Sequence, residues 1–195
     1  MDLSPRAQER LARIGALSEA ELRQLRLDKE LEGALSRYFT GTATTEELWQ
    51  QVKALSEVDG PDIIKLAQQK ITATLRLQMS AEDFEKRKAA LLALETLKKA
   101  GKYSALELLM GSIVSLRQRY NDVKQQALEQ VREQMQAQVQ AATEQARRQG
   151  TFADSASTMD AALKASPEWR DFVMRHDAAA QKTLDDYIGR IKALL

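Results

Sequence analysis

Several residue types that carry chemistry are rare or absent in this chain of 195 residues. Cysteine is absent, histidine occurs once (His176), and there are only three prolines and eight glycines. Without cysteine there can be no disulfide, thiol nucleophile or cysteine-ligated zinc site. So few glycines and prolines do not fit the many turns of an all-β fold. We therefore expect an all-α protein that has no metal site and no cofactor.

The chain also lacks an excess of charge of either sign. Its formal net charge is +1, from 29 basic and 28 acidic residues. The balance is local as well, with 17 basic and 16 acidic residues over 1–102, and 12 of each over 103–195. Neither half should therefore attract nucleic acid or anionic lipid strongly. We do not expect nucleic acid as the main partner.

Long hydrophobic runs are missing too. The longest unbroken one is Ala89–Leu94, whereas a membrane-spanning helix needs roughly 20 apolar residues. The opening Met-Asp-Leu-Ser-Pro-Arg does not resemble the basic and then apolar start of a secretory signal. We expect a cytoplasmic protein that does not bind membranes.

What the sequence does contain is a regular series of helix start and stop signals. Ser18 with Glu21 and Thr44 with Glu47 have the spacing of capping boxes. The segment Asp59-Gly60-Pro61 should break a helix, and Gly101 should end one in left-handed geometry. Further starts are predicted at Ser4-Pro5, Ser80, Ser104 and Ser166-Pro167. Residues 1–102 are therefore expected to form a cluster of short amphipathic helices, the first ending at Gly15.

Apolar residues at helical spacing mark the faces that these helices should bury. The segment after Ser18 has such a stripe, and the only two tryptophans, Trp49 and Trp169, lie within apolar stripes, so we expect both to pack in the core. The stripe after Ser18 consists of Leu22, Leu25, Leu31, Leu35 and Tyr38.

One long helix is predicted over about 104–149, because that stretch has no proline and a single glycine. Its apolar positions first follow a heptad rhythm and then a longer repeat. About 45 residues would extend roughly 68 Å, which exceeds the diameter of a compact domain of this size. The heptad part is Leu109, Ile113, Leu116, Tyr120, Val123 and Ala127, and the distal part is Val131, Met135, Val139, Ala142 and Ala146.

The remainder of the chain is expected to return along the long helix. Gly150 should end that helix, 151–158 should be a loop of small residues, and 158–165 should form one or two turns. A last helix over about 167–194 would then run antiparallel to the first. The predicted fold is an elongated all-α bundle in which 103–195 form a helical hairpin, continuous with 1–102 as one structural unit.

Motifs of catalysis were sought without success. Phosphate-binding, dinucleotide-binding and nucleophile-elbow motifs are all missing. A di-iron site is excluded because it needs Glu-x-x-His pairs, and Val173 stands three residues before the only histidine. His176 is expected to be a boundary residue on a mostly buried helix face. An enzyme that uses His176 with a cleft of carboxylates is therefore the last of our three hypotheses.

The first hypothesis is a non-catalytic helical interaction or scaffold protein. An apolar stripe along so long a helix must be buried against something. The predicted return helix is too short to cover it, so either the first helices cover the rest, as in a long core helix, or the stripe is an arm for association. We expect the distal stripe, Val131, Met135, Val139, Ala142 and Ala146, to bind a second copy of the chain or another protein. The alternative is a nucleic-acid or ribosome-associated protein that uses a basic cluster, Lys86, Arg87, Lys88, Lys98, Lys99 and Lys102.

Overall fold

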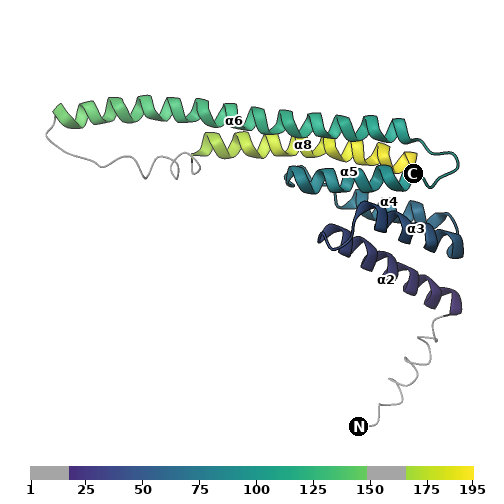
Figure 1. The fold of residues 1–195 in the computed structure, drawn as a ribbon. Helices are drawn as coiled ribbons and strands as arrows, with labels where there is room; N and C mark the ends of the chain where they lie inside the picture. Colours follow the sequence, from purple (N-terminus) through teal and green to yellow (C-terminus); the bar gives the residue numbers. More distant parts are fainter. Residues whose placement is uncertain (1–17, 149–165) are drawn as a thin grey trace, which may run out of the picture. The chain divides into compact units, whose positions relative to one another are not determined.

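A computed structural model describes residues 18–148 and 166–195 (Figure 1). All six secondary-structure elements in these ranges are helices, which confirms the all-α prediction. The predicted first helix, the loop at 151–158 and the turns at 158–165 lie outside the described residues. The helices are α2 (Glu19–Phe39), α3 (Thr45–Asp59), α4 (Asp62–Ala73), α5 (Ala81–Glu95), α6 (Tyr103–Arg148) and α8 (Pro167–Leu194).

The chain divides into two compact units, each made of two stretches of sequence. Unit 1 comprises residues 1–71 and 89–101, and unit 2 comprises residues 72–88 and 102–195. Helices α4 and α5 each contribute residues to both units. The sequence-based division after residue 102 remains a prediction.

The helix starts follow the capping chemistry that the sequence indicates. Ser18 and Glu21 form a capping box, in which the Glu21 carboxylate accepts the Ser18 backbone N–H at 2.8 Å. Thr44 and Glu47 form a second one, with the corresponding distance at 2.7 Å. Ser166 caps α8 by accepting the backbone N–H of Trp169 at 3.1 Å. These short-range bonds satisfy backbone donors that would otherwise lack a partner at a helix start.

One predicted helix end is wrong, at Gly101. Helix α6 itself begins at Tyr103, one residue before the predicted start at Ser104, and its first turn closes by a bond from Leu106 N–H to the Lys102 carbonyl. Gly101 does not adopt the predicted left-handed geometry, since the only positive φ angles in the described ranges are at Gly41 (79°) and Gly60 (95°). The reason is that α5 has already ended at Glu95, and tight i→i+3 turns then carry the chain onward.

In unit 1, helices α2 and α3 pack as a pair joined by contacts at both ends. Near the connecting turn, the hydroxyls of Tyr38 and Thr45 are 3.2 Å apart. At the far end, Arg23 forms an ion pair with Asp59. The residues that unit 1 buries from α2 and α3 are Leu27, Leu31, Ala34, Leu35, Tyr38, Leu48 and Val52.

The apolar stripe predicted after Ser18 is only partly correct. Leu31, Leu35 and Tyr38 are buried as expected, but Leu22 is 43% exposed and Leu25 is 53% exposed. A helical period identifies residues that share a face, yet only neighbouring elements decide which turns of that face are covered. The first turns of α2 therefore present apolar side chains to solvent.

Polar contacts are also buried inside unit 1. The carboxylate of Glu95, which is 2% exposed, accepts a bond from Gln68 Nε2 at 2.7 Å. Lys98 lies 2.9 Å from the same carboxylate. A buried charge is tolerated only when it is paired and hydrogen-bonded, so these contacts tie the end of α5 to α4.

In unit 2, an arginine on α6 holds the segment that leads into α5. The Arg117 guanidinium donates to the carbonyls of Leu77 (3.2 Å), Met79 and Ser80 (3.3 Å). Its central carbon lies 4.6 Å from the centre of the buried Phe84 ring. Burial lowers the pKa of Arg117 below its ordinary value, although a guanidinium stays protonated in proteins.

Helix α6 also packs directly against α8 (Figure 1). The buried residues of these two helices in unit 2 are Leu106, Leu109, Met110, Ile113, Tyr120, Ala180, Leu184 and Ile191. Across residues 18–148 and 166–195, none of the helices has an apolar stretch long enough to cross a membrane.

Candidate interaction surfaces

The burial of α6 declines steadily from its first turns toward its distal part. Ile113 is fully buried and Tyr120 is 3% exposed, whereas Ala127, Val131 and Met135 are only half-buried. Apolar residues at helical spacing nevertheless continue through this decline, although the heptad rhythm gives way to a longer repeat. The side chains of Val139, Ala142 and Ala146, the other members of the predicted interaction stripe, lie outside what the structure describes.

Four rings stack in series where α6 meets the first half of α8. The Tyr120 and His176 rings lie 4.9 Å apart, and those of His176 and Phe172 lie 5.3 Å apart. Phe172 stacks in turn on Trp169 at 5.6 Å. His176 Nε2 lies 3.0 Å from the Tyr120 carbonyl oxygen, which can only accept, so Nε2 carries the proton. His176 thus serves packing and registration rather than standing open in a cleft.

The hydroxyl of Tyr120 is the centre of a polar network beside this stack. It donates to Asp177 Oδ1 at 2.8 Å and accepts bonds from Gln78 Nε2 at 2.9 Å and Lys124 Nζ at 2.8 Å. One donor and two acceptor sites are the full capacity of a phenol. Burial alone would lower the pKa of Lys124, but the bond to Tyr120 and the charge of Asp177 outweigh it, and the pKa is raised.

A groove of about 600 Å³ opens next to this network in unit 2. Arg76 lines it, but Arg76 Nη1 is already bonded to the carbonyls of Ala73 and Leu75, each at 2.7 Å. Asp177 lines it too, and its carboxylate receives the Tyr120 hydroxyl. The groove therefore brings together no nucleophile with a base. Within the ranges described, no group of three or more His, Asp or Glu side chains could hold a metal ion. The lining residues are Arg76, Leu77, Gln78, Asp177, Ala178 and Gln181.

Most basic side chains of the cluster that the nucleic-acid hypothesis uses have a carboxylate partner within the chain. Lys86 pairs with Glu82 at 2.8 Å, and Arg87 pairs with Asp83 at 3.5 Å. The partners of Lys88 and Lys98 are Glu85, at 3.4 Å, and Glu95, at 2.9 Å. Lys99 is exposed, and Lys102 donates to the Leu194 carbonyl at 3.4 Å. Such pairing reduces the positive potential available to a phosphate backbone.

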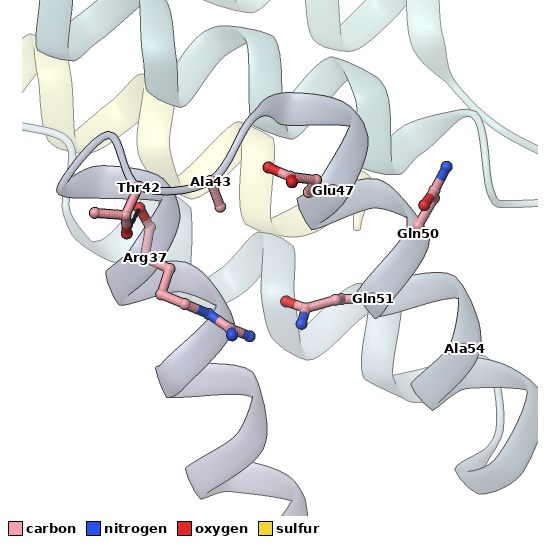
Figure 2. A pocket seen from close by; sticks show the side chains of 7 residues that line it. All are labelled: Arg37, Thr42, Ala43, Glu47, Gln50, Gln51 and Ala54. Atoms are coloured by element: carbon pink, nitrogen blue, oxygen red, sulfur yellow. Dashed lines mark hydrogen bonds between the residues drawn. The ribbon is translucent and has the colours of Figure 1, made fainter.

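The α2–α3 pair carries a second groove, of about 560 Å³ and almost entirely apolar, in unit 1. Its walls include the small residues Gly33, Ala34 and Ala54, and it reaches Val58, which is 73% exposed. It adjoins a more polar pocket of about 350 Å³ near the connecting turn. Figure 2 shows Arg37 and Gln51 pointing toward each other across that pocket, one from each helix.

Sequence reasoning missed both the Tyr120 network and the α2–α3 groove. The network joins residues that are 42 and 57 positions apart, and a single sequence gives no signal for such pairs. The groove had a weak signal in Gly33, a glycine in the interior of a predicted helix, which costs helix stability and therefore suggests a packing role.

Most of the chain matches the model of a described protein family. The model of a family described as "Family of unknown function (DUF6657)" matches residues 49–194. No curated protein and no solved structure matches the chain.

Proposed function

The chain belongs to this family of unknown function (DUF6657), whose model covers most of its length, and we propose that it is a non-catalytic helical interaction protein. In this proposal it self-associates as a homodimer through the distal part of α6, in the cytoplasm. The distal stripe, defined as Val131, Met135, Val139, Ala142 and Ala146, forms the interface.

The proposal includes an antiparallel hairpin of α6 and α8. Three contacts support this arrangement within unit 2. Lys102, just before α6, reaches the carbonyl of Leu194 at the end of α8. Further along α6, Tyr120 contacts His176 and Asp177. Residue numbers thus rise along one helix as they fall along the other, as an antiparallel pair requires.

The observation that carries the proposal is that α6 continues past the start of α8 (Figure 1). Counting from the contact between Tyr120 and His176, the start of α8 at Pro167 lies beside about residue 129 of α6. Helix α6 then runs on to Arg148, which is roughly 19 residues or 28 Å further. A half-apolar helix of that length is marginal in water unless its apolar face is packed. The distal stripe is therefore the part of α6 that needs a partner.

The composition of the stripe indicates how strong the interface would be. Alanine permits a close approach of two helices but buries little apolar area. A stable interface buries about 800 Å² per partner, and a seam of two valines, one methionine and two alanines is short of that. We therefore expect a dimer that dissociates on dilution, with isologous contacts about a twofold axis.

Light scattering after size exclusion, at several concentrations, tests the proposal. The molar mass should rise toward twice the chain mass of 21.9 kDa as the concentration increases. Val131→Asp combined with Val139→Asp should keep the mass at that of one chain. The matched control is Gln126→Asp with Gln140→Asp, which adds the same charge on the opposite face and should leave the dimer intact. A wild-type monomer at all concentrations, or an unchanged dimer in the valine variant, would contradict the proposal.

A further inference from the structure

The α2–α3 groove has the same residue spacing on both of its walls, which suits it to hold a third helix. Each of the two helices contributes four residues at i, i+3, i+4 and i+7, the spacing of one helix face. Gly33, Ala34 and Ala54 are small, and a Cβ atom added at Gly33 would meet nothing within 4 Å. Small side chains let helices approach to the short end of the usual axial separation of about 8–10 Å. The wall positions are 30, 33, 34 and 37 on α2, and 51, 54, 55 and 58 on α3.

The α2 wall of the groove carries opposite charges at its two ends. Glu30 and Arg37 are both exposed and lie about 10 Å apart along the helix axis, too far to pair with each other. Across residues 18–148 and 166–195, neither of them forms an ion pair with another side chain. A helix that occupies the groove should therefore bring a cation to Glu30 and a carboxylate to Arg37, with small residues between the two.

We propose that the occupant is α2 of a second copy of the chain, running antiparallel about a twofold axis that passes between Gly33 and Ala34. Glu30 and Arg37 each lie about 5 Å from this axis along the helix, on opposite sides of it. The twofold therefore places Glu30 of each copy opposite Arg37 of the other, and both ion pairs form at once. The same register sets Arg26 beside the C-terminal end of the second copy's α2, where the helix dipole favours a cation.

A second hydrogen-bond donor stands at the arginine end of the groove. Figure 2 shows Arg37 on α2 and Gln51 on α3 pointing toward each other. The Gln51 amide makes no hydrogen bond to another side chain within the part of the chain that the structure describes. Glu47 lines the same pocket, but its carboxylate already accepts the Thr44 backbone N–H at 2.7 Å. An incoming carboxylate would thus meet a guanidinium and an amide, one from each helix, and Glu30 of the second copy supplies it.

The size of this contact indicates how long it lasts. It covers only about two turns of α2, whereas a stable interface buries about 800 Å² per partner. We therefore expect a short-lived association that does not hold two chains together during size exclusion. A disulfide can trap such a contact, and the natural chain has no cysteine, so an introduced thiol reports on this contact alone.

Cysteine trapping tests the position of the axis. Gly33→Cys places a thiol beside the twofold, where the same residue of two copies comes within disulfide distance. The substitution is made together with Val131→Asp and Val139→Asp, so that the proposed α6 dimer cannot bring the chains together. After oxidation with diamide, we expect an interchain disulfide at least about tenfold more abundant than in the control Glu32→Cys in the same background. Glu32 is exposed on α2 but faces about 100° away from Gly33.

Charge reversal tests the two ion pairs. Glu30→Arg, added to the Gly33→Cys variant, sets like charges opposite each other and should lower the cross-linking at least about tenfold. Arg37→Glu should do the same. An equal mixture of these two charge-reversed chains should recover the disulfide between unlike chains, because every arginine then faces a glutamate. The circular dichroism of each variant should match that of the parent, which shows that α2 and α3 remain folded.

Two outcomes would overturn the inference. Equal or absent cross-linking in Gly33→Cys and Glu32→Cys would show that the groove does not hold a second α2. A mixture that cross-links no better than its separate chains would show that Glu30 and Arg37 do not pair, and would leave the groove to a helix of another protein. Either result is independent of the proposed α6 dimer, because Val131→Asp with Val139→Asp removes that interface from every sample.

Discussion

Tyr120 on α6 and His176 on α8 are joined by two different contacts at once. Their rings stack with an angle of 2° between the planes, and His176 Nε2 donates to the Tyr120 carbonyl at 3.0 Å. The stack restricts how far apart the two helices lie, and the hydrogen bond restricts their register. Together they fix how α6 and α8 pair in unit 2.

Removing only the hydroxyl of Tyr120 should destabilise unit 2 while the ring stack stays in place. In Tyr120→Phe, Gln78 loses its hydroxyl partner, and Lys124 and Asp177 keep only their direct ion pair at 3.4 Å. We therefore expect a loss of about 1–3 kcal/mol in the free energy of unfolding. Urea unfolding followed by circular dichroism measures it. The control is Tyr103→Phe, at an exposed tyrosine, which should change stability by less than about 0.5 kcal/mol. Equal effects of the two substitutions would refute the role of the network.

Arg117 should not be replaceable by lysine. The guanidinium donates to three backbone carbonyls and lies over the ring of Phe84, and a lysine ammonium lacks this planar fork. Arg117→Lys should lower the free energy of unfolding by about 2–4 kcal/mol. Arg119→Lys, at an exposed neighbour, is the control and should be nearly neutral. A fully stable Arg117→Lys variant would mean that the carbonyls find other donors.

The capping box of α3 should contribute to acid sensitivity. Bonds from the backbone and side chain of Thr44 lower the pKa of Glu47 in the folded protein. The contribution to stability is therefore present above the unfolded-state glutamate pKa of about 4.3 and is lost as the pH falls through the folded-state value. Glu47→Gln keeps an acceptor oxygen but no longer titrates, so it should flatten this part of the stability curve between about pH 3 and 5.

The control for this experiment is Glu46→Gln, which leaves the capping box intact. It should retain the acid-side loss of the wild type in thermal melts over the same pH range. If both variants show the same curve, Glu47 does not contribute to acid sensitivity.

Two glycine-to-alanine substitutions should have opposite effects. Gly60 has a φ of 95°, which an L-residue adopts only with strain, so Gly60→Ala should cost about 1–2 kcal/mol. Gly111 is exposed inside α6, and a Cβ there meets nothing within 4 Å. Gly111→Ala should therefore add about 0.5–1 kcal/mol of stability. Thermal unfolding of the two variants compares them directly, and a shift in the same direction would contradict this account.

The parts of the fold that could be predicted from the sequence depend on local chemistry. The boxes at Ser18 and Thr44 involve residues three apart, so the donor, the acceptor and their spacing can be read together. The break at Gly60 is equally local, because glycine is the residue type that adopts a positive φ angle without strain. Gly101 shows the limit of this reasoning. A glycine near a helix end permits left-handed geometry but does not impose it. Helix α5 ends earlier, at Glu95, where i→i+3 hydrogen bonds replace the helical ones.

The parts that could not be predicted depend on which faces meet. Leu22 and Leu31 have the same residue type and lie on one helix, yet Leu22 is 43% exposed and Leu31 is fully buried. The difference comes from neighbours distant in sequence. Both tryptophans were expected in the core and are only half-buried, since Trp49 uses its ring N–H to reach Thr96 at 3.0 Å. A polar handle of this kind favours the boundary of a core.

Because burial declines along α6, we expect this helix to unfold locally from its distal end. Backbone amides exchange with solvent through local openings, and the free energy of an opening follows the packing that must be broken. In the dissociated single chain, exchange should be fastest in the distal turns of α6 and should slow toward Tyr120 and Ile113, where the ring stack and then the core begin. A force that pulls on the distal end would therefore unfold α6 turn by turn. The unfolding should stop where Tyr120 stacks on His176.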